Sequence, residues 1–325
     1  MKKSIFVFLV GCGSVEIITE KETQVAATGD EDLESPPLSM DTAEQSEDEP
    51  ETELPSQPEA QDYSVSGPYS VTSTEGSFPA TGCAAGMPYE HFVPEGVENP
   101  PFMVLGHGFL RSGKMLGWGE HLASWGVEVV APELCHFNVL AGVDHEQNGV
   151  NMIELADGFG RDAVIYGGQS AGGLAAIIAT AQDPNAIGLI GLDATDTEDV
   201  PSVPDFVGQL YAGSVTTPAY GLLGEPSTCN SNNNGITLYE MMDIAKVVRV
   251  TSADHCDFEN PTDWLCVSLC TNEGTSFSDE EISSVIKHLG TSAALALSGD
   301  SDAEWQWDTE TLTPVIESGQ IEVLR

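Results

Sequence analysis

The stretch VIYGGQSAGGLAAIIAT, residues 164–180, joins a run of apolar residues to a helix-like run of small residues through a turn that contains one serine. The turn, Gly168-Gln169-Ser170-Ala171-Gly172, fits the pattern Gly-x-Ser-x-Gly. A sharp turn from strand to helix strains its central residue and leaves no room for a side chain on either flank, which glycine satisfies. The stretch therefore predicts a buried strand, a tight turn that presents Ser170, and a helix.

Strand-like and helix-like segments alternate along the chain on both sides of this turn. Strands that alternate with helices form a mostly parallel sheet with helices on both faces, so the predicted fold class is α/β. Functional side chains are then expected at the carboxyl ends of the strands. We expect strands near residues 69–72, 87–92, 102–105, 127–131, 163–166, 187–192, 219–223 and 246–251, and helices near 114–124, 150–157, 171–181, 236–243 and 279–296.

Residues 13–62 differ in composition from the rest of the chain. They contain sixteen Asp or Glu against one Lys, together with five prolines. Such a segment buries too little apolar surface to offset the entropy lost on ordering, so we predict a disordered acidic tether. The folded domain is expected to cover residues 63–298, and residues 299–325 are expected to form an acidic C-terminal tail.

The first twelve residues, MKKSIFVFLVGC, have the layout of a secretory signal: two lysines, a short apolar run and a small residue before Cys12. Residues 9–12 resemble a bacterial lipobox, in which the cysteine becomes the lipidated first residue of the mature protein. We therefore expect a lipoprotein of the bacterial cell envelope, anchored through Cys12 at the outer membrane or cell surface. The alternatives are a secreted protein and a cleaved signal peptide with a chance cysteine.

Charge and cysteine content limit the partners. The chain has 52 acidic against ten basic residues and a net charge of −42, which excludes a nucleic-acid partner because phosphates would be repelled. We expect no structural metal, because the cysteines form no Cys-x-x-Cys pair or Cys/His cluster at zinc spacing. An even number of cysteines follows the signal, compatible with up to three disulfides in an oxidising compartment, at positions 83, 135, 229, 256, 266 and 270.

A serine hydroxyl needs a base before it can act as a nucleophile. Two histidines follow Ser170 in the sequence. His288 lies within a predicted helix and has the pattern of a surface or packing residue. His255 lies just beyond a predicted strand, at the edge of the sheet where Ser170 is expected, so it is the predicted base.

An acid that orients the imidazole should follow a strand at the same edge. Asp193 comes directly after the strand that follows the serine helix, and Glu225 follows the next strand. We favour Asp193 and keep Glu225 as the alternative acid. Asp196 and Asp199 would serve as loop caps, although the three aspartates together would also fit a calcium ion.

Two backbone N–H groups are expected to stabilise an oxyanion beside Ser170. One belongs to Ala171, at the start of the predicted helix. The other belongs to Phe109 in MVLGHGFLRSG, residues 103–113, where Gly108 lets the backbone turn its amide toward the serine. His107 is expected to orient this loop.

The motifs GHGF, GQSAGG, GLDATD and ADHCDF, in this order and spacing, resemble the chlorophyllase, dienelactone hydrolase and polyester hydrolase (PET hydrolase-like cutinase) branch of the α/β-hydrolase fold. The resemblance covers roughly residues 67–296. In chlorophyllase-like members an aspartate in a matching stretch is the acid, which favours Asp193. In polyester hydrolases a disulfide ties the acid loop to the histidine loop, which implies a bridge between Cys229 and Cys256.

These observations predict an exported serine hydrolase that cleaves carboxylic esters through an acyl-enzyme. Ser170 would attack, His255 would carry the proton, Asp193 would hold the imidazole, and the N–H groups of Phe109 and Ala171 would stabilise the oxyanion. We expect no cofactor and no metal, a small-molecule or polymeric ester as substrate, and a monomer. The alternatives are an amidase or peptidase with the same triad, and a non-catalytic binding module on a hydrolase fold.

Overall fold

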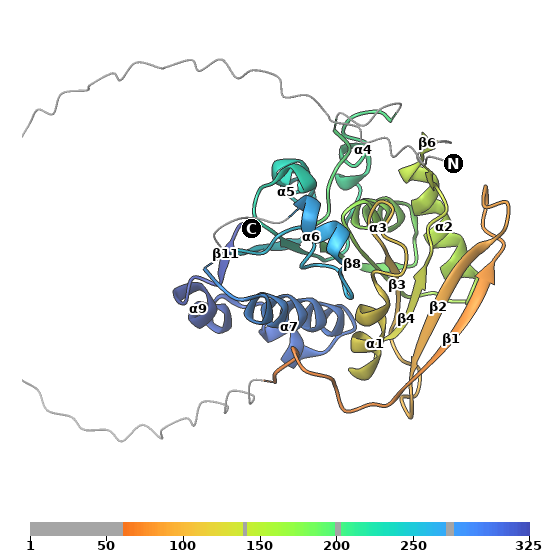
Figure 1. Cartoon of the computed structure of the whole chain (residues 1–325). Helices are drawn as coiled ribbons and strands as arrows, with labels where there is room; N and C mark the ends of the chain where they lie inside the picture. Colours follow the sequence, from red (N-terminus) through yellow and green to blue (C-terminus); the bar gives the residue numbers. More distant parts are fainter. Residues whose placement is uncertain (1–60, 139–141, 199–202, 271–275) are drawn as a thin grey trace, which may run out of the picture. The chain divides into compact units, whose positions relative to one another are not determined.

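A computed structural model describes residues 61–138, 142–198, 203–270 and 276–325 (Figure 1). The expected signal sequence, the lipidation site Cys12 and all but the last two residues of the expected tether lie outside the described residues. None of the helices within the described part of the chain is long and apolar enough to span a membrane.

Within the described residues, one nine-stranded sheet forms the centre of the fold, in the order β1-β2-β4-β3-β7-β8-β9-β10-β11. The strands from β4 to β10 run parallel, and β1, β2 and β11 pair antiparallel at the two edges. The strands are β1 (Val71–Phe78), β2 (Met87–Pro94), β3 (Phe102–Gly106), β4 (Glu128–Pro132), β7 (Val164–Gln169), β8 (Ala186–Leu192), β9 (Ala219–Leu223), β10 (Ala245–Val250) and β11 (Ile321–Val323). A separate short ribbon pairs β5 (Phe137–Asn138) with β6 (Gly142–Val143).

Helices cover both faces of this sheet (Figure 1). One apolar cluster joins the sheet to α2 and α3, and a second joins the opposite face to α1 and α7. The predicted α/β fold class is therefore confirmed. The helices are α1 (Leu116–Ser124), α2 (His145–Gly158), α3 (Ala171–Gln182), α4 (Gln209–Ala212), α5 (Ile236–Glu240), α6 (Trp264–Cys270), α7 (Asp279–Leu297), α8 (Ser301–Trp305) and α9 (Thr309–Glu317), with a 3₁₀ helix η1 (Thr228–Asn233).

The helix expected at residues 150–157 begins five residues earlier, at His145. The Asp144 carboxylate accepts the N–H of Gln147 at 2.9 Å and so caps the first turn. A capping aspartate satisfies one of the N–H groups that the start of a helix leaves unpaired. The polar residues that follow Asp144 therefore form a helical turn.

The C-terminal residues form part of the domain rather than a separate tail, which corrects the expected boundary at residue 298. Strand β11 pairs antiparallel with β10. Trp307 is 3% exposed, lies 4.8 Å from the ring of Tyr220, and donates its indole N–H to the Ser292 hydroxyl at 3.1 Å. The segment is held by few buried apolar residues. Because acidic residues outnumber them, the composition of the segment predicted a tail instead of a packed part of the domain.

We expect Trp307→Ala to lower the free energy of unfolding by about 3–5 kcal/mol, the usual cost of removing a buried tryptophan. Trp264→Ala is the matched control, because Trp264 is 79% exposed and its removal should change stability by less than about 0.5 kcal/mol. Urea unfolding followed by circular dichroism measures both. Equal effects of the two substitutions would contradict the packing of the C-terminal segment.

Candidate active site

Ser170 lies at a strained turn between β7 and α3, with φ 55° and ψ −122°. A non-glycine residue rarely adopts such a positive φ, and the surroundings must enforce it. A Cβ on Gly168 would approach the Gly172 backbone to 2.5 Å, and one on Gly172 would approach the Gly106 carbonyl oxygen to 2.4 Å. The glycines of the motif are therefore required by backbone-to-backbone packing.

The structure brings together the predicted nucleophile, base and favoured acid. Ser170 Oγ lies 2.8 Å from His255 Nε2, and His255 Nδ1 lies 2.6 Å from Asp193 Oδ2. Because an ionised carboxylate only accepts hydrogen bonds, Nδ1 carries the proton and Nε2 is free to accept the serine hydroxyl. The three residues are 9%, 7% and 0% exposed, so water is largely kept away from this chain of hydrogen bonds.

Asp193 is held by donors from the neighbouring loop. Its Oδ1 accepts the N–H of Gly224 at 3.0 Å, and its Oδ2 accepts the Asn230 side-chain amide at 3.1 Å. A buried carboxylate needs such partners, because an unpaired buried charge is costly. Sequence reasoning missed Asn230, which stands in an asparagine-rich segment of no recognisable motif.

The alternative acid and the other downstream histidine lie elsewhere. The Glu225 carboxylate accepts the N–H of Ser252 at 3.0 Å and so holds the turn after β10. His288 Nδ1 accepts the N–H of Tyr63 at 3.3 Å, and the two rings are 5.6 Å apart. The structure therefore gives both residues packing and turn contacts, while His255 contacts Ser170.

The loop after β3 presses against the serine turn. A Cβ on Gly108 would meet the Gln169 side-chain oxygen at 2.2 Å and Ser170 Cβ at 3.2 Å, so a larger residue there would displace the Gln169 amide and press on Ser170. His107 is buried, its Nδ1 donates to the Gly108 carbonyl at 2.7 Å, and its Nε2 accepts the N–H of Leu134 at 3.0 Å. Burial lowers the pKa of His107, and the two hydrogen bonds of its ring orient this loop.

A pocket of about 200 Å³ opens beside Ser170. It contains both residues expected to supply oxyanion N–H groups, and the N–H of Ala171 is at the first position of α3, where a helix offers no internal partner. A larger hollow of about 530 Å³, near α7 and α9, contains none of the predicted site residues. Besides Ser170, Phe109 and Ala171, the pocket is lined by Val143, His145, Thr195, Asp196, Thr197, Cys229 and Ser231.

The aspartates after β8 do not gather around a metal site within the described residues. Asp196 Oδ1 accepts the N–H groups of Thr197 at 2.8 Å and Gly208 at 2.7 Å, which is the loop-capping arrangement. Asp193 faces His255, and Asp199 lies outside the described residues. Among the described residues, the two clusters with metal-ligand spacing are Cys83, Cys135 and His136, and Cys256, Cys266 and Cys270, and all five cysteines are paired in disulfides.

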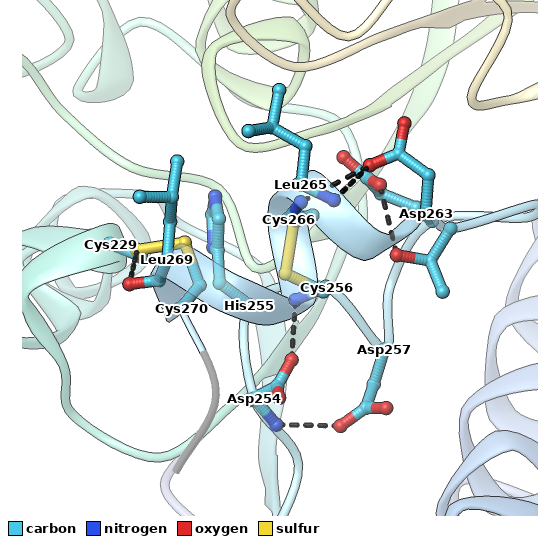
Figure 2. Close-up of a disulfide and its surroundings, with 12 residues drawn as sticks. Cys229, Asp254, His255, Cys256, Asp257, Asp263, Leu265, Cys266, Leu269 and Cys270 are labelled. Carbon is cyan, nitrogen blue, oxygen red and sulfur yellow. Dashed lines mark hydrogen bonds between the residues drawn. A yellow bond between two sulfur atoms is a disulfide. The ribbon is translucent and has the colours of Figure 1, made fainter. Parts of the chain in front are cut away.

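The predicted bridge between Cys229 and Cys256 is wrong. Cys229 bonds to Cys270, and Cys256 bonds to Cys266, with Cα–Cα distances of 5.7 and 5.8 Å (Figure 2). Both partners lie on α6, so the loop beside the acid and the loop of the histidine are tied through this helix rather than directly. Residue spacing could not reveal this, because α6 lies between the two loops only in the folded chain. The third bridge joins Cys83 to Cys135.

Two aspartates close the turn that carries His255. The N–H of Asp254 donates to Asp257 Oδ2, and the N–H of Cys256 donates to Asp254 Oδ1, both at 2.7 Å (Figure 2). Burial, and then the charge of Asp254, raise the pKa of Asp257 to about 7. The backbone on both sides of His255 is therefore held by short hydrogen bonds.

An ion pair joins the loop after β3 to the loop after β10. The Arg111 guanidinium binds both carboxylate oxygens of Glu259, at 2.5 and 2.6 Å, and reaches Asp263 at 3.0 Å. The Glu259 carboxylate is fully buried, and its hydrogen bonds raise the pKa of Arg111 further above its usual value. Arg111 thus couples the segment of Phe109 to the segment of His255, a link that no sequence motif indicated.

No family model matches the chain, and no curated protein matches its sequence. Among solved structures it is similar to a candidate dienelactone hydrolase from Klebsiella pneumoniae subsp. pneumoniae MGH 78578, with 18% identity and a TM-score of 0.46. The similarity covers 55% of this chain and 85% of that chain. The α/β fold described above follows from the strand order and helix placement of this chain itself.

We expect Arg111→Met to lower the free energy of unfolding by about 3 kcal/mol, because it leaves the Glu259 carboxylate buried without its partner. The double variant Arg111→Met/Glu259→Met should recover much of this loss, since no charge is then stranded. Arg249→Met is the control: its partner Glu322 is exposed, and the loss should stay below about 1 kcal/mol. Urea unfolding measures all three, and additive losses in the double variant would refute the coupling.

Proposed function

We propose that this chain is a serine hydrolase that cleaves carboxylic esters through an acyl-enzyme intermediate. The observation that carries the proposal is the continuous hydrogen-bonded chain from Ser170 through His255 to Asp193. It begins at a strained turn that holds the hydroxyl at the carboxyl edge of a parallel sheet. A serine, a base and a buried acid in these roles form the arrangement that activates a hydroxyl for acyl transfer.

Each residue has one role in the proposed reaction. Ser170 Oγ attacks the acyl carbon while His255 Nε2 takes its proton, and the Asp193 carboxylate stabilises the imidazolium that forms. The N–H groups of Phe109 and Ala171 donate to the oxyanion of the tetrahedral intermediate. His255 then gives the proton to the leaving alcohol. In the second half of the reaction His255 takes a proton from water, which attacks the acyl carbon, and returns it to Ser170 Oγ as the acid leaves.

The size of the pocket favours a short acyl group. At about 200 Å³ it is smaller than sites that enclose drug-sized ligands, which reach roughly 300–1,000 Å³. Phe109, Val143 and Ala171 give it an apolar lining. We therefore expect acetyl and butyryl esters to be better substrates than long-chain esters.

The same chain is proposed to be exported and anchored through Cys12. Three disulfide pairs support the proposal, since such bonds persist in oxidising compartments and are rare in the cytosol. The six cysteines of these disulfides should not react with a thiol reagent in the native protein. Reaction of all six would argue against export.

The test is labelling by a fluorophosphonate probe together with hydrolysis of p-nitrophenyl esters from C2 to C12. We expect the wild-type chain to be labelled and active, and Ser170→Ala to lose both properties. Asp193→Asn should lower kcat by about 10⁴-fold, as loss of the orienting carboxylate does elsewhere. Its matched control Glu225→Gln should retain activity.

Two outcomes would overturn parts of this proposal. A folded wild-type chain that neither labels nor hydrolyses any ester of the series would refute the esterase. Loss of activity in Glu225→Gln with activity retained in Asp193→Asn would refute the acid assigned here.

A further inference from the structure

Large apolar side chains are exposed around the serine pocket. Of the thirteen exposed among the described residues, eight lie on the segments that follow β3, β8 and β10, the strands whose carboxyl ends border the site. Two of the segments also supply residues to the pocket lining. The exposed apolar residues are therefore concentrated where a substrate would enter. They are Phe109, Leu110, Phe206, Leu210, Trp264, Leu265, Val267 and Leu269.

Helix α6 contributes half of this group and is the most apolar part of it. Its seven residues, WLCVSLC, carry no charge, and Cys266 alone among them is buried. Trp264 is 79% and Leu269 71% exposed. In Figure 2 the side chains of Leu265 and Leu269 extend from α6 in the same direction as the imidazole of His255.

Two disulfides fix this helix in its exposed position. Cys266 bonds to Cys256, the residue after His255, and Cys270 bonds to Cys229, which lines the serine pocket. A helix of seven residues does not hold its shape in water without tertiary contacts, so these bonds keep it in place. The chain thus maintains an apolar surface next to the reacting groups at the cost of leaving it in water.

The charge of the chain restricts what this surface can meet. The net charge is −42, so an anionic membrane would be repelled, and α6 offers no cation to offset that repulsion. A partner with an uncharged apolar surface does not repel the chain. Contact with such a partner removes water from Trp264 and Leu269, which is favourable. The disulfide from Cys270 to the pocket residue Cys229 and the one from Cys266 to Cys256, next to His255, keep α6 close to the serine pocket, so a surface that contacts α6 is near Ser170.

We propose that α6 and the apolar residues around it seat this protein on the surface of an aggregated, uncharged ester, such as a micelle or an emulsion droplet. The inference rests on the proposed esterase and specifies its substrate class: esters presented at an apolar surface rather than dissolved singly. Adsorption through α6 raises the local ester concentration at the pocket, while the chemistry at Ser170 is the same for dissolved and aggregated esters.

The test compares dissolved p-nitrophenyl acetate with tributyrin below and above saturation, using the full 325-residue chain. We expect the rate on tributyrin to rise sharply once droplets form. Trp264→Ser and Leu269→Ser should lower the rate on emulsion by about tenfold, the loss in surface partitioning expected for one large apolar side chain. Their rate on dissolved p-nitrophenyl acetate should match that of the wild type, and added salt should not weaken adsorption.

Ile244→Ser is the matched control. Ile244 is exposed but directly precedes β10, so it lies at the amino ends of the parallel strands, away from the serine pocket. It should behave as the wild type on both substrates. Light scattering of the wild type and Leu269→Ser tests whether a second copy covers the patch, and we expect a monomer in both.

Several results would overturn the inference while leaving the esterase intact. These are activity on p-nitrophenyl acetate with no rise at tributyrin saturation, or equal emulsion rates in wild type, Trp264→Ser and Leu269→Ser. Stronger adsorption to anionic than to neutral vesicles, or a dimer that Leu269→Ser dissociates, would also overturn it. Absence of hydrolysis of every dissolved ester would instead refute the proposed function itself.

Discussion

The backbone of Ser170 is the constraint on which the rest of the site depends. A positive φ at a non-glycine residue costs on the order of 1–3 kcal/mol and persists only where the surroundings over-determine it. Here a buried strand and a buried helix approach from either side, and Gly108, Gly168 and Gly172 allow neighbouring backbones to touch the turn. Because a side chain at Gly168 or Gly172 would collide with neighbouring backbone, the close packing of β3, β7 and α3 sets the position of the hydroxyl.

The chain has few basic residues for its large negative charge, and several of them join separate segments of the fold. From Tyr63 onward there are 36 acidic residues and seven lysines or arginines. Arg111 joins two loops of the site, Arg161 pairs with the buried Glu128, and Arg325 donates to one backbone carbonyl in the last turn of α5 and to one just after it. Arg111 and Arg161 each offset the charge of a buried carboxylate on another segment, while exposed carboxylates remain solvated and repel one another only weakly through water.

The fold and the central site residues were predictable because they depend on local order along the chain. A parallel sheet brings the carboxyl ends of its strands to one edge, so Ser170, Asp193 and His255, each at the end of a strand, were expected to meet. The bridge from Cys229 was not predictable, since it depends on the place of a short helix in space. Asn230 and Arg111 were missed for the same reason: each acts on a residue far away in the sequence.

The position of Asp193 explains how the loop after β9 is used. Because the carboxylate that contacts His255 follows β8, the loop after β9 contributes no group to the hydrogen-bonded chain of Ser170, His255 and Asp193 and supports it instead. Through Gly224 and Asn230 it donates to Asp193, and through Cys229 it holds α6 beside His255. One segment therefore orients Asp193 and anchors the exposed apolar helix, so a displacement of this loop would disturb both the His255 imidazole and the surface next to the pocket.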